Sequence, residues 1–498
     1  MHGNKLTAWL LVLAMVLTLT GCNPPADGTS NPDGHKRPAS LMTADEVFQT
    51  LDGGYHEYFE PKDGGYGQLV PYVGRVEMYE IAETDEITYF SWWGLCTADG
   101  YAVTDAVYTA IEWYELENGN AVFELREQDV DAMMAGEDDY TDRGWIIAQD
   151  GSWMIECGDR AYLYSTSNYR MVVTTYTDPV WYRFYDYDGK AVGQLQAKRG
   201  QELSLQPFSG GYAYVEHWSA EHGETVGYYI NRKGDRVFTN DFVYGDSFEN
   251  GKAVACIVGE QYGILNENGT WFVEPKYGHI TRTDNYFVLS DGSGCTVIDT
   301  NGHEWRRLEN TTHVSLVVGK RVLYSTDHDD SLRYLDSGER VINDKTRTAV
   351  TIYDTFGDTF LTTHDKKEHR LYLLDYDGHV INEIPDFKHV AGYDDHYLSV
   401  YSYSDENRLQ LINLSDGTQR LSTYGYAYAT PIPGWYCIDD GKGNYTLRNM
   451  SNSEQIRFPH TELLVQKFGG KIYYQTFNTE IAVLMNDTMT PIVKLKNK

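Results

Sequence analysis

One short turn pattern recurs along almost the whole chain and limits the folds that the chain can adopt. An example is Asp375-Tyr376-Asp377-Gly378, where an Asp side chain caps the backbone and the glycine accepts a positive φ at no steric cost. The turn glycines are Gly100, Gly151, Gly189, Gly234, Gly269, Gly302, Gly338, Gly378 and Gly417. Two degenerate turns follow, near Asn452-Ser453 and Asn486-Asp487. The spacing is roughly 38 residues, which predicts about eleven repeated units.

The segments beside each turn have the pattern of short β-strands. Apolar residues 371–374 lead into one turn and residues 380–384 leave it, which indicates a hairpin. Residues 397–403 alternate in the manner of a further strand. The composition agrees, since 41 tyrosines and 46 glycines accompany only 14 prolines. A unit of three or four short strands cannot bury its apolar face alone, so the units must stack on one another.

The predicted fold class is therefore all-β, a tandem array of about eleven units with three to four short strands each. Propeller-like blades are the favoured interpretation, because a blade is a sheet of four short strands. Since about eleven units exceed the roughly 4 to 8 blades of one ring, two propellers, one large irregular propeller or an open β-superhelix are the alternatives. A few short helices are expected near the N-terminus, at residues 43–51, where Thr43 and Glu46 form a capping-box pattern, and at residues 127–135.

Two longer sequence motifs also recur along the chain, in addition to the turns. Residues 93–111 align with residues 262–280 without a gap, so that Gly94 meets Gly263 and Tyr108 meets Tyr277. A third copy begins at residue 227. A second motif, in which Phe precedes Gly by three residues and Ala by five, occurs at residues 208–215 and again at 248–255.

These units resemble the WG repeat, also called KWG, of bacterial secreted and surface proteins. The resemblance covers the Trp/Tyr-Gly start, the Asn/Asp-x-x-Gly turn, the Pro-x-Tyr stretch and the F-x-x-G-x-A-x-V ending. It is clearest in residues 93–111, 208–215, 227–255 and 262–280. From Gly302 onward the turn persists, but the leading glycine and the ending largely erode. The resemblance implies a repeat architecture with a binding or scaffold role, and it implies no reaction. We expect residues 41–180 to form an N-terminal repeat region with helical decorations and residues 181–498 to form a C-terminal region of WG-type β-repeats.

The N-terminal segment is interpreted as a targeting signal. Lys5 precedes a 14-residue apolar run, residues 6–19, which is too short to span a membrane and is typical of a secretory signal peptide. The following Leu19-Thr20-Gly21-Cys22 resembles the lipobox of bacterial lipoproteins, although an ordinary signal peptide with a chance cysteine is the alternative. We therefore expect residues 1–21 to be a lipoprotein signal peptide and residues 22–40 to be a lipidated cysteine followed by a flexible tether. Lipid on Cys22 would anchor the mature protein to the membrane, outside the cytoplasm, at the cell surface or facing the periplasm.

Charge and cysteine usage exclude several classes of function. With 41 Lys and Arg against 73 Asp and Glu, the formal net charge is −32, which disfavours nucleic acid as a partner. The cysteines after Cys22 are widely spaced and odd in number, so the sequence signals neither a zinc site nor a disulfide framework. They are expected to be mostly buried free thiols, and they are Cys96, Cys157, Cys256, Cys295 and Cys437.

The sequence contains no signature of a catalytic nucleophile, a zinc protease, a phosphate loop or a dinucleotide fold. Asp186-Tyr187-Asp188-Gly189 and residues 375–378 lack the further oxygen ligands of a calcium loop and are interpreted as plain hairpin turns. No catalytic residue, metal ligand or cofactor-binding residue is therefore assigned, and no cofactor is expected. Two acidic residues distant in sequence could still converge in space, as the two carboxylates of a glycosidase do.

Paired aromatic residues are the remaining clue to function. Trp92, Trp93, Trp435 and Tyr436 lie where repeats begin or end and are the candidate ligand-contact aromatics, although most aromatics of such a chain fill its core. The sequence thus favours a noncatalytic, lipid-anchored extracytoplasmic module that binds a protein or glycan at the cell envelope. The alternative is an envelope carbohydrate-active hydrolase that uses convergent carboxylates on a propeller.

Overall fold

The computed structural model describes residues 57–496 apart from short gaps. The gaps are residues 82–85, 136–139, 176, 284, 319–320, 328, 342–350, 357–358, 365–368, 376, 378, 394–395, 406–407, 425, 453, 460 and 490. The expected signal peptide, Cys22, the tether and the helix expected at residues 43–51 lie outside the described residues.

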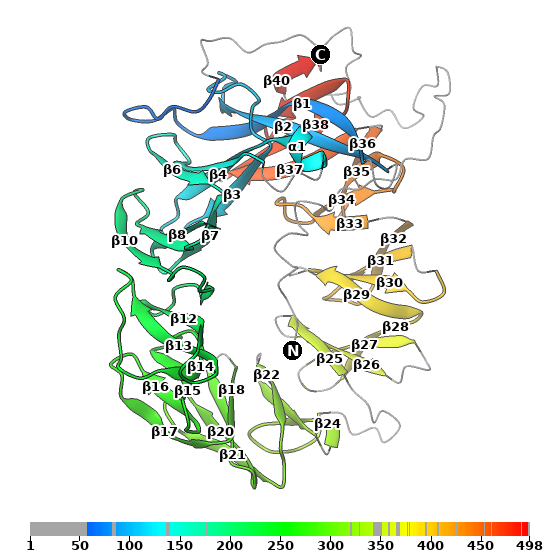
Figure 1. Cartoon of the computed structure of the whole chain (residues 1–498). Helices are drawn as coiled ribbons and strands as arrows, with labels where there is room; N and C mark the ends of the chain where they lie inside the picture. The colour runs from blue at the N-terminus through cyan, green and yellow to red at the C-terminus, as the bar shows by residue number, and fades with distance from the viewer. Residues whose placement is uncertain are drawn as a thin grey trace. The chain divides into compact units, whose positions relative to one another are not determined.

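Strands account for nearly all the regular structure, and Figure 1 shows them following one another along the chain as small sheets. The first three sheets contain β1 (Leu69–Ile81) and β2 (Glu86–Thr97); β3 (Ala110–Glu115), β4 (Ala121–Gln128), β5 (Asp142–Ala148) and β6 (Met154–Asp159); β7 (Ala161–Ser167), β8 (Arg170–Thr175), β9 (Trp181–Tyr185) and β10 (Ala191–Gln196). One short helix, α1 (Val130–Met134), lies between β4 and β5, inside the segment where a helix is predicted, and the Asp129 side chain caps it.

A seven-stranded sheet follows and spans two repeats. It contains β11 (Leu203–Leu205), β12 (Tyr212–Ser219), β13 (Glu224–Asn231), β14 (Phe242–Gly245), β15 (Lys252–Ile257), β16 (Tyr262–Asn266) and β17 (Trp271–Tyr277). The next two sheets contain β18 (His279–Thr283), β19 (Tyr286–Ser290), β20 (Gly294–Asp299) and β21 (Glu304–Glu309); β22 (Val314–Val318), β23 (Val322–Thr326) and β24 (Asp329–Tyr334).

Four four-stranded sheets complete the described chain. They contain β25 (Thr351–Phe356), β26 (Thr359–His364), β27 (Arg370–Asp375) and β28 (Val380–Ile384); β29 (Phe387–Tyr393), β30 (Tyr397–Ser402), β31 (Arg408–Asn413) and β32 (Gln419–Tyr424); β33 (Tyr426–Ala429), β34 (Trp435–Asp439), β35 (Asn444–Asn449) and β36 (Gln455–Pro459); β37 (Glu462–Phe468), β38 (Lys471–Phe477), β39 (Ile481–Met485) and β40 (Pro491–Lys496). Consecutive strands pair within each sheet, which is the up-and-down order of a β-propeller blade. The predicted all-β array of blade-like units is confirmed.

The predicted turns fall at one recurring place in these sheets. Most of them connect the third strand of a unit to the fourth, as between β16 and β17 or between β20 and β21. At Gly100, Gly234 and Gly338 the turn instead leads to a single bridging residue: Ala102, Arg236 or Arg340. Every one of the predicted turn glycines that the structure describes has a positive φ, for example 81° at Gly269. The turn spacing therefore identified the units correctly.

The glycine that opens a WG-like unit lies beneath an aromatic ring. A β-carbon at Gly94 would come within 2.6 Å of the Tyr72 ring, and one at Gly227 within 2.4 Å of the Tyr214 ring. Each glycine lies in a strand that pairs with the strand of the aromatic residue. Any side chain at these two positions would displace a ring that fills the core, so both positions require glycine.

The chain divides into two compact units. The first contains residues up to Thr177, Tyr185–Ala191 and Tyr428–Lys498, and the second contains Asp178–Phe184 and Val192–Ala427. In the first unit the two ends of the described chain meet, because Leu69 and Leu95 share a buried cluster with Leu484 and Val493. In the second unit each sheet contributes to small clusters shared with the next sheet, as where Val254 and Ile264 pack with Ile280 and Phe287.

All five described cysteines are free and buried, as the sequence predicts. Burial raises the pKa of the Cys437 thiol to about 11, so this thiol stays protonated and unreactive at neutral pH. Among the helices of the described residues, none has the length and apolar character needed to cross a bilayer.

Candidate functional site

The candidate aromatics Trp92 and Trp93 lie next to each other in β2 and are half-buried. The Arg75 guanidinium carbon lies 4.2 Å from the centre of the Trp92 ring, and the indole Nε1 of Trp92 donates to Glu77 over 3.2 Å. Trp93 packs against the cluster formed by Val73, Phe477 and Ala482. Both rings therefore already have partners within the first unit.

The pair in β34 is still less accessible. Tyr436 is only 3% exposed, and Trp435 packs against the cluster that contains Cys437 and Leu447. The expectation that Tyr436 contacts a ligand is therefore wrong, because its ring belongs to the core. The structure places Trp92 and Trp93 in a different sheet from Trp435 and Tyr436 and does not gather the four rings into one site.

In the Asp-rich turns, an Asp side chain caps the turn by accepting hydrogen bonds from backbone N–H groups. The Asp186 side chain accepts from the backbone N–H groups of Asp188 and Lys190. In the same way Asp375 accepts from the N–H groups of Asp377 and His379. The ligand atoms of Asp375, Asp377 and His379 lie within 4.8 Å of one another, but this is the internal geometry of a solvent-facing hairpin turn. The interpretation as hairpin turns is confirmed.

A polar pocket lies within the second unit, where three successive repeats meet. Its volume is about 460 Å³, within the range of pockets that take small ligands. Its lining comes from the first strand of each repeat, β11, β14 or β18, or from the residues that follow that strand. The lining residues are Gln206, Tyr244, Asp246, Ser247, Glu249, His279, Ile280, Thr281 and Arg282.

Arg282 lies at the base of this pocket and contacts two carboxylates and two backbone carbonyl groups. Its side chain is 10% exposed, and its Nη1 lies 3.5 Å from Oδ1 of Asp246 while Nη2 contacts Glu249. The same Nη1 donates to the carbonyl oxygens of Ser247, at 2.8 Å, and Lys252, at 3.2 Å. Two carboxylates and two backbone carbonyls therefore occupy the guanidinium. We call Arg282, Asp246 and Glu249 the open cluster.

Asp246 is the most perturbed acid of the pocket. Burial raises its pKa to about 6, although Arg282 and the backbone N–H of Val254 act in the opposite direction. That N–H donates to Oδ1 over 2.7 Å, and the side chain is 23% exposed. Among the described residues, none donates a hydrogen bond to the other oxygen, Oδ2. This oxygen remains available to a ligand.

A ladder of rings forms one wall beside the open cluster. The centres of the Tyr244 and Tyr262 rings are 5.5 Å apart, and those of the Tyr262 and His279 rings are 5.6 Å apart. Tyr244 is the outermost of the two tyrosines and is 41% exposed. The pocket therefore combines a flat aromatic face with hydrogen-bonding groups.

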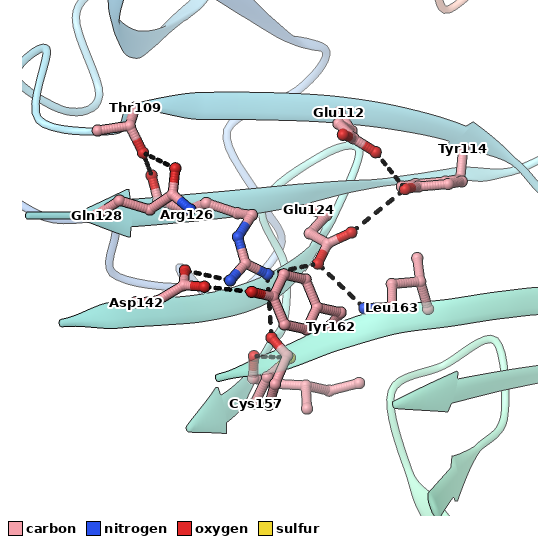
Figure 2. A network of polar contacts seen from close by, with 12 residues as sticks. Thr109, Glu112, Tyr114, Glu124, Arg126, Gln128, Asp142, Cys157, Tyr162 and Leu163 are labelled. Atoms are coloured by element: carbon pink, nitrogen blue, oxygen red, sulfur yellow. Dashed lines mark hydrogen bonds and ion pairs between the residues drawn. The ribbon is translucent and has the colours of Figure 1, made fainter. Parts of the chain in front are cut away.

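A second arginine cluster lies in the first unit and has no opening to solvent. Figure 2 shows Arg126 of β4 between Glu124 and Asp142, with the Tyr162 ring against the guanidinium. The side chains of Arg126, Glu124 and Asp142 are 7%, 4% and 2% exposed. The guanidinium carbon lies 3.6 Å from the centre of the Tyr162 ring. We call Arg126, Glu124 and Asp142 the sealed cluster.

The sealed cluster joins the β3–β6 sheet to β7 of the next sheet. Arg126 donates to the Ala161 carbonyl over 3.2 Å, and Glu124 accepts from the Leu163 N–H over 3.0 Å. Burial raises the pKa of Glu124, partly offset by the Leu163 N–H and by Arg126. Burial alone would lower the pKa of Arg126, but Asp142 outweighs it and the net direction is upward. Both carboxylates and both terminal nitrogens of Arg126 have protein partners, whereas the buried Nε of Arg126 has none. Pairing of buried charges across two sheets is the pattern of a structural link.

Sequence reasoning missed the pocket. One signal was present, because Gln206 and Asp246 both stand two residues before the Phe of the F-x-x-G motif, at Phe208 and Phe248. Both backbone N–H groups bond in the same way, Gln206 to the Tyr214 carbonyl and Asp246 to the Val254 carbonyl. The repeat alignment thus predicts that the side chains of Gln206 and Asp246 point in the same direction from their repeats. It does not predict that Arg282 lies in the same pocket.

No protein-family model and no curated protein matches the chain. Among solved structures, the chain is similar to BamB from Moraxella catarrhalis at 13% identity, with 58% of this chain and 93% of that chain covered and a TM-score of 0.29. It is also similar to a eukaryotic initiation factor at 10% identity, with 79% and 96% covered and a TM-score of 0.40. A third similar structure is Hsv2p of Kluyveromyces lactis at 10% identity, with 52% and 97% covered and a TM-score of 0.28. These values carry no argument about ligands or chemistry.

Proposed function

We propose that the protein is a lipid-anchored extracytoplasmic binding module, without catalytic activity, that recognises a glycan or protein at the cell envelope. The anchor rests on the lipobox-like residues 19–22 and the tether that follows. The exclusion of nucleic acid rests on the net charge of −32. The WG-like repeats support a binding or scaffold role.

One observation carries the noncatalytic part of the proposal: the acids of the polar pocket are tied to Arg282. A glycosidase needs one carboxyl group free to donate a proton and a second free to attack or to activate water. Here Glu249 and Asp246 share one guanidinium, and the backbone N–H of Val254 occupies the Asp246 oxygen that faces it. This arrangement suits recognition better than turnover.

The hydrolase alternative is favoured by a separate observation. Asp246 has its pKa raised to about 6 by burial, as a general acid requires, and a second carboxylate lines the same pocket. The two functions predict different outcomes with the same substrate, because an enzyme releases reducing ends and a binding module does not.

Two experiments test the proposal. In the first, the full chain and Cys22→Ala are expressed in a bacterial host with a labelled fatty acid, and we expect label and membrane association only in the unsubstituted chain. Label on Cys22→Ala, or none on either chain, contradicts the anchor.

In the second, the full chain is incubated with solubilised envelope glycans and proteins. We expect a stable complex with one of them and no release of reducing ends over time. Steady release that Asp246→Asn abolishes would establish the hydrolase instead.

A further inference from the structure

We propose that the polar pocket is a saccharide site, selective for sugars without acidic groups, in which Tyr244 stacks on one face of a sugar ring and Asp246 accepts from its hydroxyl groups. This inference rests on the proposed binding function and names the site and the ligand class.

The free hydrogen-bonding groups of the pocket match a polyhydroxylated ligand. Asp246 Oδ2 is an open acceptor, as described above. The Ser247 hydroxyl is 3.5 Å from Oε1 of Gln206, and the Thr281 hydroxyl is 3.4 Å from Nδ1 of His279. Both hydrogen bonds are long, so both hydroxyl groups can rotate toward a ligand. Hydroxyl and amide groups that both donate and accept complement sugar hydroxyls, which do the same.

The charge of the pocket excludes acidic ligands. One arginine and two carboxylates line it, so its formal charge is negative. Arg282 cannot compensate by binding an anion, because its guanidinium is 10% exposed and already contacts Asp246, Glu249 and two carbonyl oxygens. A phosphate, a sulfate or a uronic acid would meet Asp246 without a counter-charge.

The ring ladder supplies the apolar half of the site. The Tyr244 ring is 41% exposed and contacts the tilted Tyr262 ring, which in turn contacts the His279 ring, so neighbouring rings hold Tyr244 in place. An aromatic face carries partial negative charge and attracts the polarised C–H groups of a sugar face. A flat platform next to a carboxylate therefore fits a sugar ring better than a flexible basic peptide.

Isothermal titration of the full-length protein tests the proposal with four probes. Three of the probes are sugars: the neutral N-acetylchitotetraose, the amino sugar chitotetraose and the acidic tetragalacturonate. The fourth probe is a tetralysine peptide. We expect binding of the neutral sugar, with or without binding of the amino sugar, and none of the acidic sugar. Asp246→Asn should weaken the bound sugar on the order of tenfold to a hundredfold, and Tyr244→Ala roughly tenfold.

Two control variants in the second unit separate the loss of the site from general damage to the fold. Asp241→Asn removes a carboxylate whose Oδ1 lies 2.9 Å from Arg236, away from the pocket lining, and Trp218→Ala removes a ring that is 62% exposed. Both should bind like the unsubstituted protein. Circular dichroism confirms that each variant is folded.

Three results overturn the inference. They are equal binding of tetragalacturonate, tetralysine binding that Asp246→Asn abolishes while no sugar binds, and the absence of binding by every probe at millimolar concentration. If sugar binds but Asp246→Asn and Tyr244→Ala leave its affinity unchanged, the site assignment fails while the proposed binding function stands. Release of reducing ends would instead contradict the proposed function.

Discussion

The two arginine clusters have the same composition and opposite surroundings. The sealed cluster of the first unit and the open cluster of the second each place one guanidinium between two carboxylates. The acids of the sealed cluster are 4% and 2% exposed, whereas those of the open cluster are 23% and 53% exposed. Burial, and not the choice of residues, distinguishes a link between sheets from a candidate binding site.

The energetics of burial explain why the two clusters have different uses. Removing one member of a buried ion pair leaves an uncompensated charge, whereas replacing the whole group by apolar residues can be neutral. A cluster that faces solvent lets water compensate a lost partner. The sealed cluster should therefore be costly to break, and the open cluster should tolerate change in the folded state.

The largest expected effect follows from breaking the sealed cluster. Arg126→Met should lower the free energy of unfolding by about 3–5 kcal/mol, because Glu124 and Asp142 stay buried without a counter-charge. Urea unfolding followed by tryptophan fluorescence measures the change. The combined substitution Arg126→Met, Glu124→Leu and Asp142→Leu should recover most of this loss. If the combined variant is the less stable of the two, the cluster is not simply an ion network.

The same substitution in the open cluster should cost less. Arg282→Met removes the donor to the Ser247 and Lys252 carbonyls, and we expect a loss of about 1–3 kcal/mol, since Glu249 and Asp246 reach water. The same urea experiment gives the comparison. A loss as large as that of Arg126→Met would show that the pocket floor is as sealed as the first cluster.

A smaller effect concerns the pH dependence of stability. The pKa of Asp246 is raised from its usual 3.8 to about 6, so between these values the folded chain holds a proton that the unfolded chain releases. Stability from this group is therefore greatest below the lower value and decreases as the pH rises through the higher one. Asp246→Asn should remove that decrease, whereas Asp241→Asn should keep it. Thermal unfolding in a series of buffers measures both, and identical profiles for the two variants would contradict the assignment.

The sequence was sufficient to predict the units but not the pocket. Turn glycines such as Gly269 reveal the period because only one backbone conformation fits each turn. Whether an aromatic side chain is buried is harder to predict, and Tyr436 is an example. Residues 436–438 are buried in succession because β34 is covered on both faces. Two neighbouring aromatic residues in the sequence therefore do not indicate an exposed surface. The clusters depend on which acids converge around Arg126 and Arg282, and that convergence is set by the packing of successive sheets.

The most direct test of the open cluster as the binding site is the affinity of N-acetylchitotetraose measured across pH. This sugar has no titratable group, so any change of affinity reports on the protein. We predict that affinity increases with pH through about 6, as Asp246 ionises and becomes a stronger acceptor, and that Asp246→Asn abolishes the increase. His279→Gln keeps both carboxylates, removes the imidazole of the pocket lining and serves as the control. An affinity that does not vary with pH, or that varies equally in Asp246→Asn, would contradict the open cluster as the binding site.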